Sequence, residues 1–501
     1  MSKYRDSKNV FKSRYGNYIG GEWVAPVDGK YVENKSPING QVLCEVPQST
    51  EKDIDKALDA AHKAQTGWER TSVMQRANIL LKIADRLEEN FELLSHAETW
   101  DKGKPIRESR AIDLDLSIDH FRYFASAIRA QEGGASEITY DAVAYHYHEP
   151  IGVVGIIVPW NFSILMTVWK IAPALAAGNS IVVKLASATP ASVLVMLDVI
   201  GDLLPAGVLN VVNGDGEKVG TYLATNPRIA KVAFTGSTAV GRQIMQSATK
   251  NIIPCTLELG GKSPNIFFSD VFEHGEAFVD KIIEGLLFFS FNQGENCTCP
   301  SRAIIHESVY DRLMEKALVR AKAIKQGNPL DDDTMIGSQV DEKQVQRILE
   351  YIEIGKKEGA QLLIGGERNT EGELAKGCFV KPTMLKGHNK MRIFQEEIFG
   401  PVSSVTTFKT DAEALEIAND TVYGLASYIW TKDIDRAYRF SRGIKAGRVW
   451  VNSLDDAPAH IAFGGYKQSG IGRETHKRTL ENYQQIKSVM VSHTNDRFKF
   501  F

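Results

Sequence analysis

The sequence predicts an α/β fold built on mainly parallel sheets. Short apolar runs alternate with segments of helical periodicity along most of the 501 residues. The composition, 43% hydrophobic and 24% charged, is that of an ordinary globular protein. Strands that alternate with helices form βαβ units, which place ligands beyond the carboxyl ends of the strands. The length leaves room for two large domains or three smaller ones.

The first predicted elements are amphipathic helices. Thr50 is expected to cap a helix that carries Asp53 at its third position, since this pairing forms a capping box. Apolar residues recur at helical spacing from Ile54 onward. A second amphipathic helix is predicted over Gln75–Leu94.

A first series of strands and helices follows in the middle of the chain. The predicted strands are Val153–Val158, Ser180–Lys184, Val208–Val212 and Lys231–Thr235. The helices predicted between and after them are Leu165–Ala177, Ala191–Leu204, Lys218–Ala224 and Ala239–Thr249. This regular alternation predicts a parallel sheet with right-handed connections.

A second series begins near Leu257, so we predict two α/β domains that meet near residue 262. Its strands are predicted at Asn265–Phe268, Ala303–His306, Val402–Phe408 and Arg448–Asn452. Its helices are predicted at Glu276–Phe291, Tyr310–Ile324, Gln344–Glu358 and Ala412–Ala418.

Two strand-like segments fit neither domain. Ala142–His148 alternates like a half-exposed antiparallel strand, and Lys487–Ser492 resembles a strand at the end of the chain. Such strands often serve edge pairing or subunit contacts. A local hairpin and a frayed tail are the simpler alternative.

Composition excludes several classes of protein. Lys and Arg number 59 against 62 Asp and Glu, so the formal charge of −3 offers no basic excess for nucleic acid. The N-terminal segment lacks the apolar core of a secretory signal. Five cysteines are an odd and sparse set for a disulfide framework. These features indicate a cytoplasmic protein that binds a small molecule.

One stretch could be mistaken for a membrane span. Ile151 to Trp169 contains no charged residue and is long enough to cross a bilayer. Pro159 would break a helix near its middle, and Asn161 is poorly tolerated inside a membrane. We therefore predict a buried strand, a turn and a helix here, and no membrane partner.

Three motifs stand where such a fold places its chemistry. The run FTGSTAVG, Phe234–Gly241, lies at a strand-to-helix junction, where backbone N–H groups attract anions. Glu258 lies at an apolar strand end, for which a salt bridge or an exposed position is the simpler explanation. Cys297 lies in a polar loop after an apolar helix, a setting that suits a nucleophile, although a loop thiol without function is the simpler alternative. Cys299 follows closely, but no further ligands accompany the pair, so no metal site is predicted.

Taken together, six motifs resemble the aldehyde dehydrogenase superfamily. They are Pro159–Phe162, FTGSTAVG, LELGGKSPN, NQGENC, EEIFGPV (Glu396–Val402) and FGGYKQSGIGRE (Phe463–Glu474). The resemblance runs from about Tyr18 to about Lys487 and is greatest to the bacterial acetaldehyde and aliphatic-aldehyde branch.

The resemblance implies a Rossmann-like NAD(P)-binding domain of residues 1–127 and 150–262 and a catalytic domain of residues 263–480. It also implies a small β oligomerisation hairpin from residues 128–149 and 481–501, and therefore a homo-oligomer, a dimer or a tetramer. The two unassigned strands fit that hairpin.

The resemblance also implies residue roles. Cys297 would be the nucleophile, Asn161 the oxyanion donor and Glu258 the general base, with Lys170 and Glu474 in a proton relay. Aldehyde oxidation would then pass through a thiohemiacetal and a thioester on the cysteine. Cofactor contacts are implied for Trp160, Lys184, Ser187, Gly236, Ser237, Gly241, Glu397 and Phe399. A pocket for small apolar aldehydes is implied for Phe162, Met166, Trp169, Phe291 and Phe463.

One departure bears on the cofactor, for which NAD is favoured. Strongly NAD-selective relatives often carry Glu where this chain has Ser187, and a carboxylate there repels the 2′-phosphate of NADP. NADP is therefore also possible. A CoA-acylating enzyme is one alternative function, although such relatives usually lack the Glu258 base. A catalytically silent relative is another, although Cys297, Asn161 and Glu258 are all present.

Overall fold

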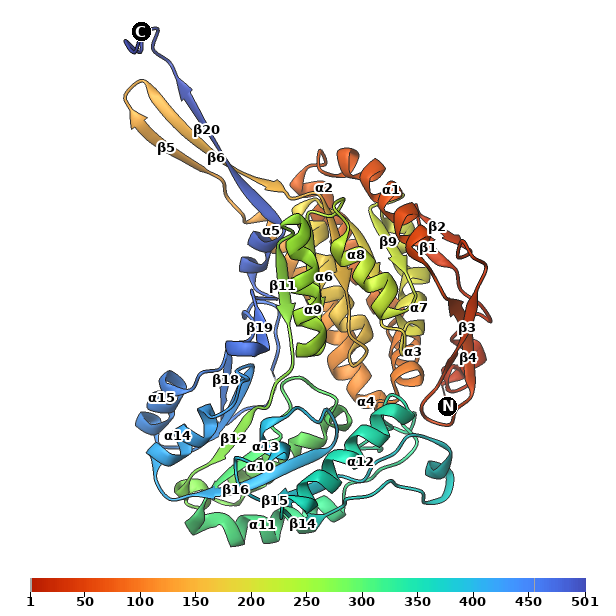
Figure 1. Ribbon diagram of the computed structural model, residues 1–501, viewed down its shortest axis with the longest axis vertical. Coiled ribbons are helices and arrows are strands. Elements are labelled where there is room, and N and C mark those ends of the chain that lie inside the picture. The colour runs from red at the N-terminus through yellow and green to blue at the C-terminus, as the bar shows by residue number, and fades with distance from the viewer. Residues whose placement is uncertain (1, 455) are drawn as a thin grey trace.

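Two large sheets organise the chain, and a small third sheet projects from them (Figure 1). The computed structural model describes residues 2–454 and 456–501. The first sheet has the strand order β19-β11-β10-β7-β8-β9-β1-β2, and the second has the order β14-β15-β16-β13-β12-β17-β18. The predicted α/β class with parallel sheets is confirmed.

The N-terminal segment adds two short strands to the edge of the first sheet, forms a separate two-stranded sheet from two more, and contributes five helices. The strands are β1 (Asn17–Ile19), β2 (Glu22–Val24), β3 (Tyr31–Lys35) and β4 (Val42–Pro47). The helices are α1 (Glu51–Trp68), α2 (Val73–Glu89), α3 (Phe91–Lys102), the short α4 (Ile106–Glu108) and α5 (Asp115–Arg129). Asp53 accepts the Thr50 N–H at 3.0 Å, so the predicted capping box is confirmed.

The single helix predicted over Gln75–Leu94 is wrong. The chain forms two helices there, because Asn90 leaves the helical conformation (φ −109°, ψ 21°) and ends α2. The Asn90 amide donates to the Arg86 carbonyl at 2.9 Å, which satisfies an acceptor in the last turn. The apolar periodicity continues across the break, which concealed it from a reading of the sequence.

The core of the first sheet is parallel. It contains β7 (Val153–Ile157), β8 (Ser180–Lys184), β9 (Leu209–Val212), β10 (Lys231–Thr235) and β11 (Cys255–Glu258). The helices of this region are α6 (Ser163–Ala177), α7 (Ala191–Ile200), α8 (Thr221–Thr225) and α9 (Thr238–Ala248). Apolar side chains of α6 and α7 pack on one face, and those of α1, α8 and α9 pack on the other. Both faces are covered, as all-parallel strands require.

The second sheet begins at β12 (Pro264–Phe267), so the chain passes between the sheets just after Glu258. Its other strands are β13 (Arg302–His306), β14 (Gln361–Ile364), β15 (Thr383–Lys386), β16 (Val402–Phe408), β17 (Ala426–Trp430) and β18 (Arg448–Val451). Its helices are α10 (Glu276–Leu287), α11 (Glu307–Lys322), α12 (Glu342–Lys357), α13 (Arg392–Gln395), α14 (Asp411–Asn419) and α15 (Ile434–Gly443).

The helix predicted over Glu276–Phe291 is also wrong at its end. α10 stops at Leu287, and a short 3-10 segment follows in which Phe291 is extended. Asn292 and Gln293 then take left-handed backbone angles, with φ of 47° and 57°. Such angles are uncommon outside glycine and often mark functional loops.

The two unassigned strands pair with each other. β6 (Ala142–Pro150) and β20 (Gln484–Ser492) are antiparallel, with Tyr147 opposite Lys487, and β5 (Gly134–Thr139) completes a three-stranded sheet. Figure 1 shows this sheet extending away from the body of the molecule. Just before β20 in the sequence, the short strand β19 (Gly470–Ile471) pairs with β11 at the edge of the first sheet. No helix in the described part of the chain is long and apolar enough to cross a membrane.

Candidate active site

A cavity of about 1900 Å³ lies where the carboxyl ends of the first sheet meet loops of the second. It is larger than the roughly 300–1,000 Å³ of a typical pocket for one small ligand. Asn161, Lys184, Glu258 and Cys297 all line it.

Strand register explains why distant residues meet there. Ile157 lies opposite Lys184 in the β7–β8 pair, and Thr235 lies opposite Glu258 in the β10–β11 pair. Because these strands are parallel, the segments that leave them emerge at one edge of the sheet. Asn161 follows β7 and therefore reaches the same edge.

Cys297 is half-buried beside the cavity, whereas its neighbour Cys299 faces the other way. The Cys299 thiol packs in the core of the second domain and donates to the Phe289 carbonyl at 3.5 Å. Burial raises the pKa of the Cys44 and Cys255 thiols, and it raises that of Cys378 to about 12. Of the five thiols, only Cys297 lines the cavity.

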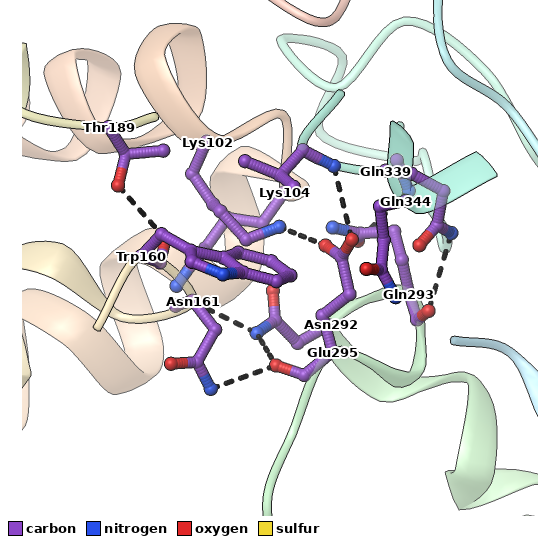
Figure 2. A network of polar contacts seen from close by, with 12 residues as sticks. Lys102, Lys104, Trp160, Asn161, Thr189, Asn292, Gln293, Glu295, Gln339 and Gln344 are labelled. Atoms are coloured by element: carbon purple, nitrogen blue, oxygen red, sulfur yellow. Dashed lines mark hydrogen bonds and ion pairs between the residues drawn. The ribbon is translucent and has the colours of Figure 1, made fainter. Parts of the chain in front are cut away.

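The Asn161 side chain is fixed by one of its two amide hydrogens. Its Nδ2 donates to the Glu295 carbonyl at 3.0 Å, and only 5% of the residue is exposed (Figure 2). A carboxamide nitrogen carries two hydrogens. The second can therefore serve a ligand in the cavity that Asn161 lines.

Glu258 is neither exposed nor in a salt bridge with any residue that the structure describes, so the expectation of a salt bridge or an exposed strand end is wrong. It is 4% exposed, and neither carboxyl oxygen has a hydrogen-bond partner in the part of the chain described. Burial raises the pKa of Glu258 well above its usual value, and the nearby charge of Glu474 raises it further. A carboxyl with a raised pKa suits proton transfer near neutral pH.

Lys170 and Glu474 form a buried pair outside the cavity lining. The Lys170 ammonium donates to Glu474 at 2.8 Å and to the Thr235 hydroxyl at 2.7 Å. The charges of both residues act on the Glu258 carboxyl, in opposite directions.

The predicted cofactor residues line one part of the cavity, except for Gly241. Burial lowers the pKa of the Lys184 ammonium to about 8. Ser237 caps α9 and turns the N-terminus of that helix toward the cavity. At Gly236, a Cβ atom would lie 2.5 Å from the Phe234 ring. Gly241 instead packs against Leu259, where a Cβ atom would lie 2.4 Å from the side chain.

Ser187 is exposed at the rim of this region. Its hydroxyl donates to the Gly214 carbonyl at 2.8 Å and lies 3.5 Å from the Lys184 ammonium. Position 187 thus offers a neutral hydroxyl beside the Lys184 ammonium, in place of the carboxylate found in strongly NAD-selective relatives.

The second domain contributes Glu397 and Phe399 to the same region. Glu397 accepts the Gly261 N–H at 3.0 Å, and burial raises the pKa of its carboxyl to about 7. Phe399 has a left-handed backbone (φ 61°), and its ring meets Trp160 edge-to-face with centroids 5.1 Å apart.

The five predicted substrate residues form one apolar cluster beside Cys297. Trp169 and Phe463 meet edge-to-face at 5.1 Å. Phe162, Met166 and Phe291 complete the set, and all five line the cavity. The sequence interpretation missed the outer wall, which includes Asp115, Asp119, Arg122, Asp456 and His460. No local motif marks these residues, because only the tertiary fold brings α5 beside the loop after β18.

No group of three or more His, Cys, Asp or Glu residues is placed to bind a metal ion within residues 2–454 and 456–501.

A cavity at the strand ends of one parallel sheet, closed by loops of a second, defines a two-domain α/β enzyme. The model of the family described as "Aldehyde dehydrogenase family" matches residues 23–489. The chain belongs to this family and is an enzyme that oxidises aldehydes.

Individual relatives align with this chain over nearly their full length. "Aldehyde dehydrogenase B" of Escherichia coli is 62% identical, over 98% of this chain and 96% of the relative. "Acetaldehyde dehydrogenase" of Pseudomonas aeruginosa is 60% identical, over 98% and 97%. The solved NAD+ complex of an aldehyde dehydrogenase from Bacillus cereus is 38% identical, with a TM-score of 0.94 over 99% of each chain.

Proposed function

We propose that the protein oxidises a small aliphatic aldehyde to its carboxylic acid, with NAD as hydride acceptor and Cys297 as nucleophile. The observation that supports this best is the convergence of Cys297, Asn161 and Glu258 on one cavity. The Glu258 carboxyl has no hydrogen-bond partner among the residues that the structure describes. An aldehyde bound beside the apolar cluster would meet all three groups.

The residues at the other part of the cavity fit a dinucleotide. The Lys184 ammonium and the Glu397 carboxyl suit ribose hydroxyls, and the N-terminus of α9 suits a phosphate. The rings of Trp160 and Phe399 would flank the nicotinamide. The NAD+ complex of the Bacillus cereus relative supports this assignment. When bound, the nicotinamide supplies the hydride acceptor.

The first step requires a thiolate at Cys297, since a thiol is a poor nucleophile. Its sulfur would bond to the aldehyde carbon to form a thiohemiacetal. The former carbonyl oxygen, which now carries a negative charge, would accept a hydrogen bond from the second Asn161 N–H. One such donor lowers a barrier by roughly 2.7–4 kcal/mol.

Loss of hydride leaves a thioester on Cys297, which Glu258 would help to hydrolyse. The Glu258 carboxylate would take a proton from water while the water oxygen bonds to the thioester carbon. The carbon–sulfur bond then breaks, which releases the acid and the Cys297 thiolate. Lys170 and Glu474 would pass the proton onward from Glu258 through the buried interior.

Acetaldehyde or another short aliphatic aldehyde fits the apolar cluster of Phe162, Met166, Trp169, Phe291 and Phe463. Relatives named for acetaldehyde at about 60% identity support the same substrate class.

The direct test follows formation of reduced cofactor with acetaldehyde, longer aldehydes and betaine aldehyde, with NAD or NADP. We expect fastest turnover with a short aliphatic aldehyde and NAD. Cys297→Ala should abolish it, and undiminished turnover in this variant would exclude the mechanism. A requirement for CoA would identify an acylating enzyme instead.

The three-stranded sheet supports a proposal of self-association. Ile486 and Met490 on β20 are 67% and 75% exposed, and Tyr147 on β6 is 51% exposed. Exposed apolar strands are uncommon in a monomer. We expect a homo-oligomer in light scattering, and a smaller species when residues 484–501 are removed.

A further inference from the structure

A fully buried ion pair lies beneath the site and belongs to none of the roles above. Lys102, the last residue of α3, donates to the Glu295 carboxylate in the loop that precedes Cys297 (Figure 2). Both side chains are 0% exposed. Burying two charges is costly unless geometry and extra hydrogen bonds compensate, so such a pair calls for an explanation.

Glu295 is held at several points at once. Its other carboxylate oxygen accepts the Val340 N–H at 3.1 Å. Its carbonyl accepts from Asn161 Nδ2 at 3.0 Å and from Asn292 Nδ2 at 2.9 Å. Asn292 Nδ2 also donates to the Asn161 carbonyl at 3.1 Å. The residue whose side chain is tied to Lys102 is thus the residue whose backbone orients the Asn161 amide.

Lys102 also lies close to the loop that carries Asn161. Its ammonium lies 5.2 Å from the centre of the Trp160 ring, next to Asn161 in sequence. The neighbouring Lys104 pairs with Asp113 at 2.9 Å and lies 4.0 Å from the Phe162 ring. Glu98 accepts the Ser163 N–H at 3.0 Å. The segment from Trp160 to Ser163 therefore packs against buried charged side chains of the N-terminal region, namely Lys102, Lys104 and Glu98.

We infer that Lys102 and Glu295 are positioning residues that set the Asn161 amide relative to Cys297. A hydrogen-bond donor stabilises a developing charge only when it is placed within a fraction of an ångström, and a misplacement of about 1 Å can cost roughly 100-fold in rate. Without the pair, the Glu295 carbonyl loses its anchor and the Asn161 donor loses its fixed direction. This inference rests on the proposed role of Asn161.

The test is a double-mutant cycle between Glu295→Gln and Asn161→Ala. Glutamine keeps the size and an acceptor for Val340, but it removes the charge that pairs with Lys102. We expect Glu295→Gln to lower kcat about 10- to 100-fold in the native background, with little change in KM for the aldehyde. In the Asn161→Ala background, Glu295→Gln should lower kcat less than about threefold, because the amide donor that Glu295 positions is already absent.

Two further variants keep the test decisive. Lys102→Met with Glu295→Gln removes both charges, and it replaces the single variant if an unpaired buried ammonium prevents folding. Its loss of kcat should likewise be much smaller in the Asn161→Ala background than in the native background. Asp270→Asn is the matched control, since Asp270 pairs with Arg436 at 3.3 Å away from the cavity lining. It should lower the melting temperature, change kcat by less than about twofold and add independently to Asn161→Ala.

Equal losses in the two backgrounds would overturn the inference, because they would indicate a general structural role. No loss in either background would also overturn it. Failure of the proposed function gives a different result: Asn161→Ala or Cys297→Ala alone would then keep full turnover.

Discussion

The Lys170 ammonium lies 2.8 Å from one Glu474 carboxylate oxygen, and the other oxygen has no hydrogen-bond partner within the described residues. Both side chains are at most 2% exposed. Their charges act on Glu258, where Glu474 raises the pKa of the carboxyl and Lys170 lowers it. The pair therefore adjusts the acidity of the proposed base from a position outside the cavity.

Opposite shifts of the pH profile follow from this arrangement. A general base works when deprotonated, so turnover limited by hydrolysis rises as the pH passes the pKa of Glu258. Glu474→Gln removes a neighbouring negative charge and should move the rise to lower pH. Lys170→Met removes a positive charge and should move it to higher pH, each by roughly one pH unit.

Measurement of kcat between about pH 6 and pH 10 checks this, with the double variant as control. Because the two charge effects on Glu258 oppose each other, the double variant should show its rise in kcat near the native pH, even where loss of the relay lowers kcat itself. Shifts in the same direction for the two single variants would contradict the electrostatic explanation.

Cofactor choice should respond to the side chain at position 187. Ser187 is exposed beside the Lys184 ammonium, and it offers no negative charge. Ser187→Glu would place a carboxylate where the 2′-phosphate of NADP would bind. We expect kcat/KM for NADP to fall at least about tenfold, which corresponds to roughly 1.4 kcal/mol, with kcat/KM for NAD changed little.

Ser187→Gln is the matched control, since it has the size of glutamate without the charge. Equal losses with NAD and NADP in Ser187→Glu would place this residue outside the region that discriminates the cofactors.

Lys262 should destabilise the fold at neutral pH. Its ammonium is buried with no hydrogen-bond partner in the part of the chain that is described, and burial lowers the pKa of the amine from 10.5 to about 7. The folded state thus releases a proton near pH 7 that the unfolded chain keeps until about 10.5. Native stability therefore rises with pH across that window.

Lys262→Met removes the buried amine and should raise the melting temperature at pH 6. The free energy of unfolding should increase by about 1–3 kcal/mol. The gain should shrink as the pH rises from 7 toward 10.5, where the lysine of the unfolded chain also loses its proton. Lys343→Met at an exposed position is the control and should leave the melting temperature unchanged. A lower melting temperature for Lys262→Met at pH 6 would show that the amine has a stabilising role.

Much of the fold could be predicted because the central strands are buried on both faces and therefore form continuous apolar runs. The predicted bounds Ser180–Lys184 and Lys231–Thr235 match β8 and β10. β14 was missed because its side chains are exposed or half-buried, which leaves no clear pattern in a short strand. The helix break at Asn90 was missed because apolar periodicity continues through it.

The site divides in the same way. Cys297, Asn161 and Glu258 lie in long motifs, so the resemblance identified them as candidates. The lack of a hydrogen-bond partner for Glu258 among the described residues depends on tertiary packing, which a motif at a strand end does not report. The Lys102–Glu295 pair joins residues 193 positions apart, and nothing local marks either one as charged and buried. Gly241 lies in a recognised motif, yet it packs against Leu259 outside the cavity lining.

The central claim is that Cys297 forms a thioester which Glu258 helps to hydrolyse. The most direct measurement is the mass of the Glu258→Gln variant after it has reacted with acetaldehyde and NAD. We predict one burst of reduced cofactor per active site, a mass increase of one acetyl group, and its location on the peptide that contains Cys297. A burst without added mass on that peptide, or acetylation of another residue, would contradict the mechanism.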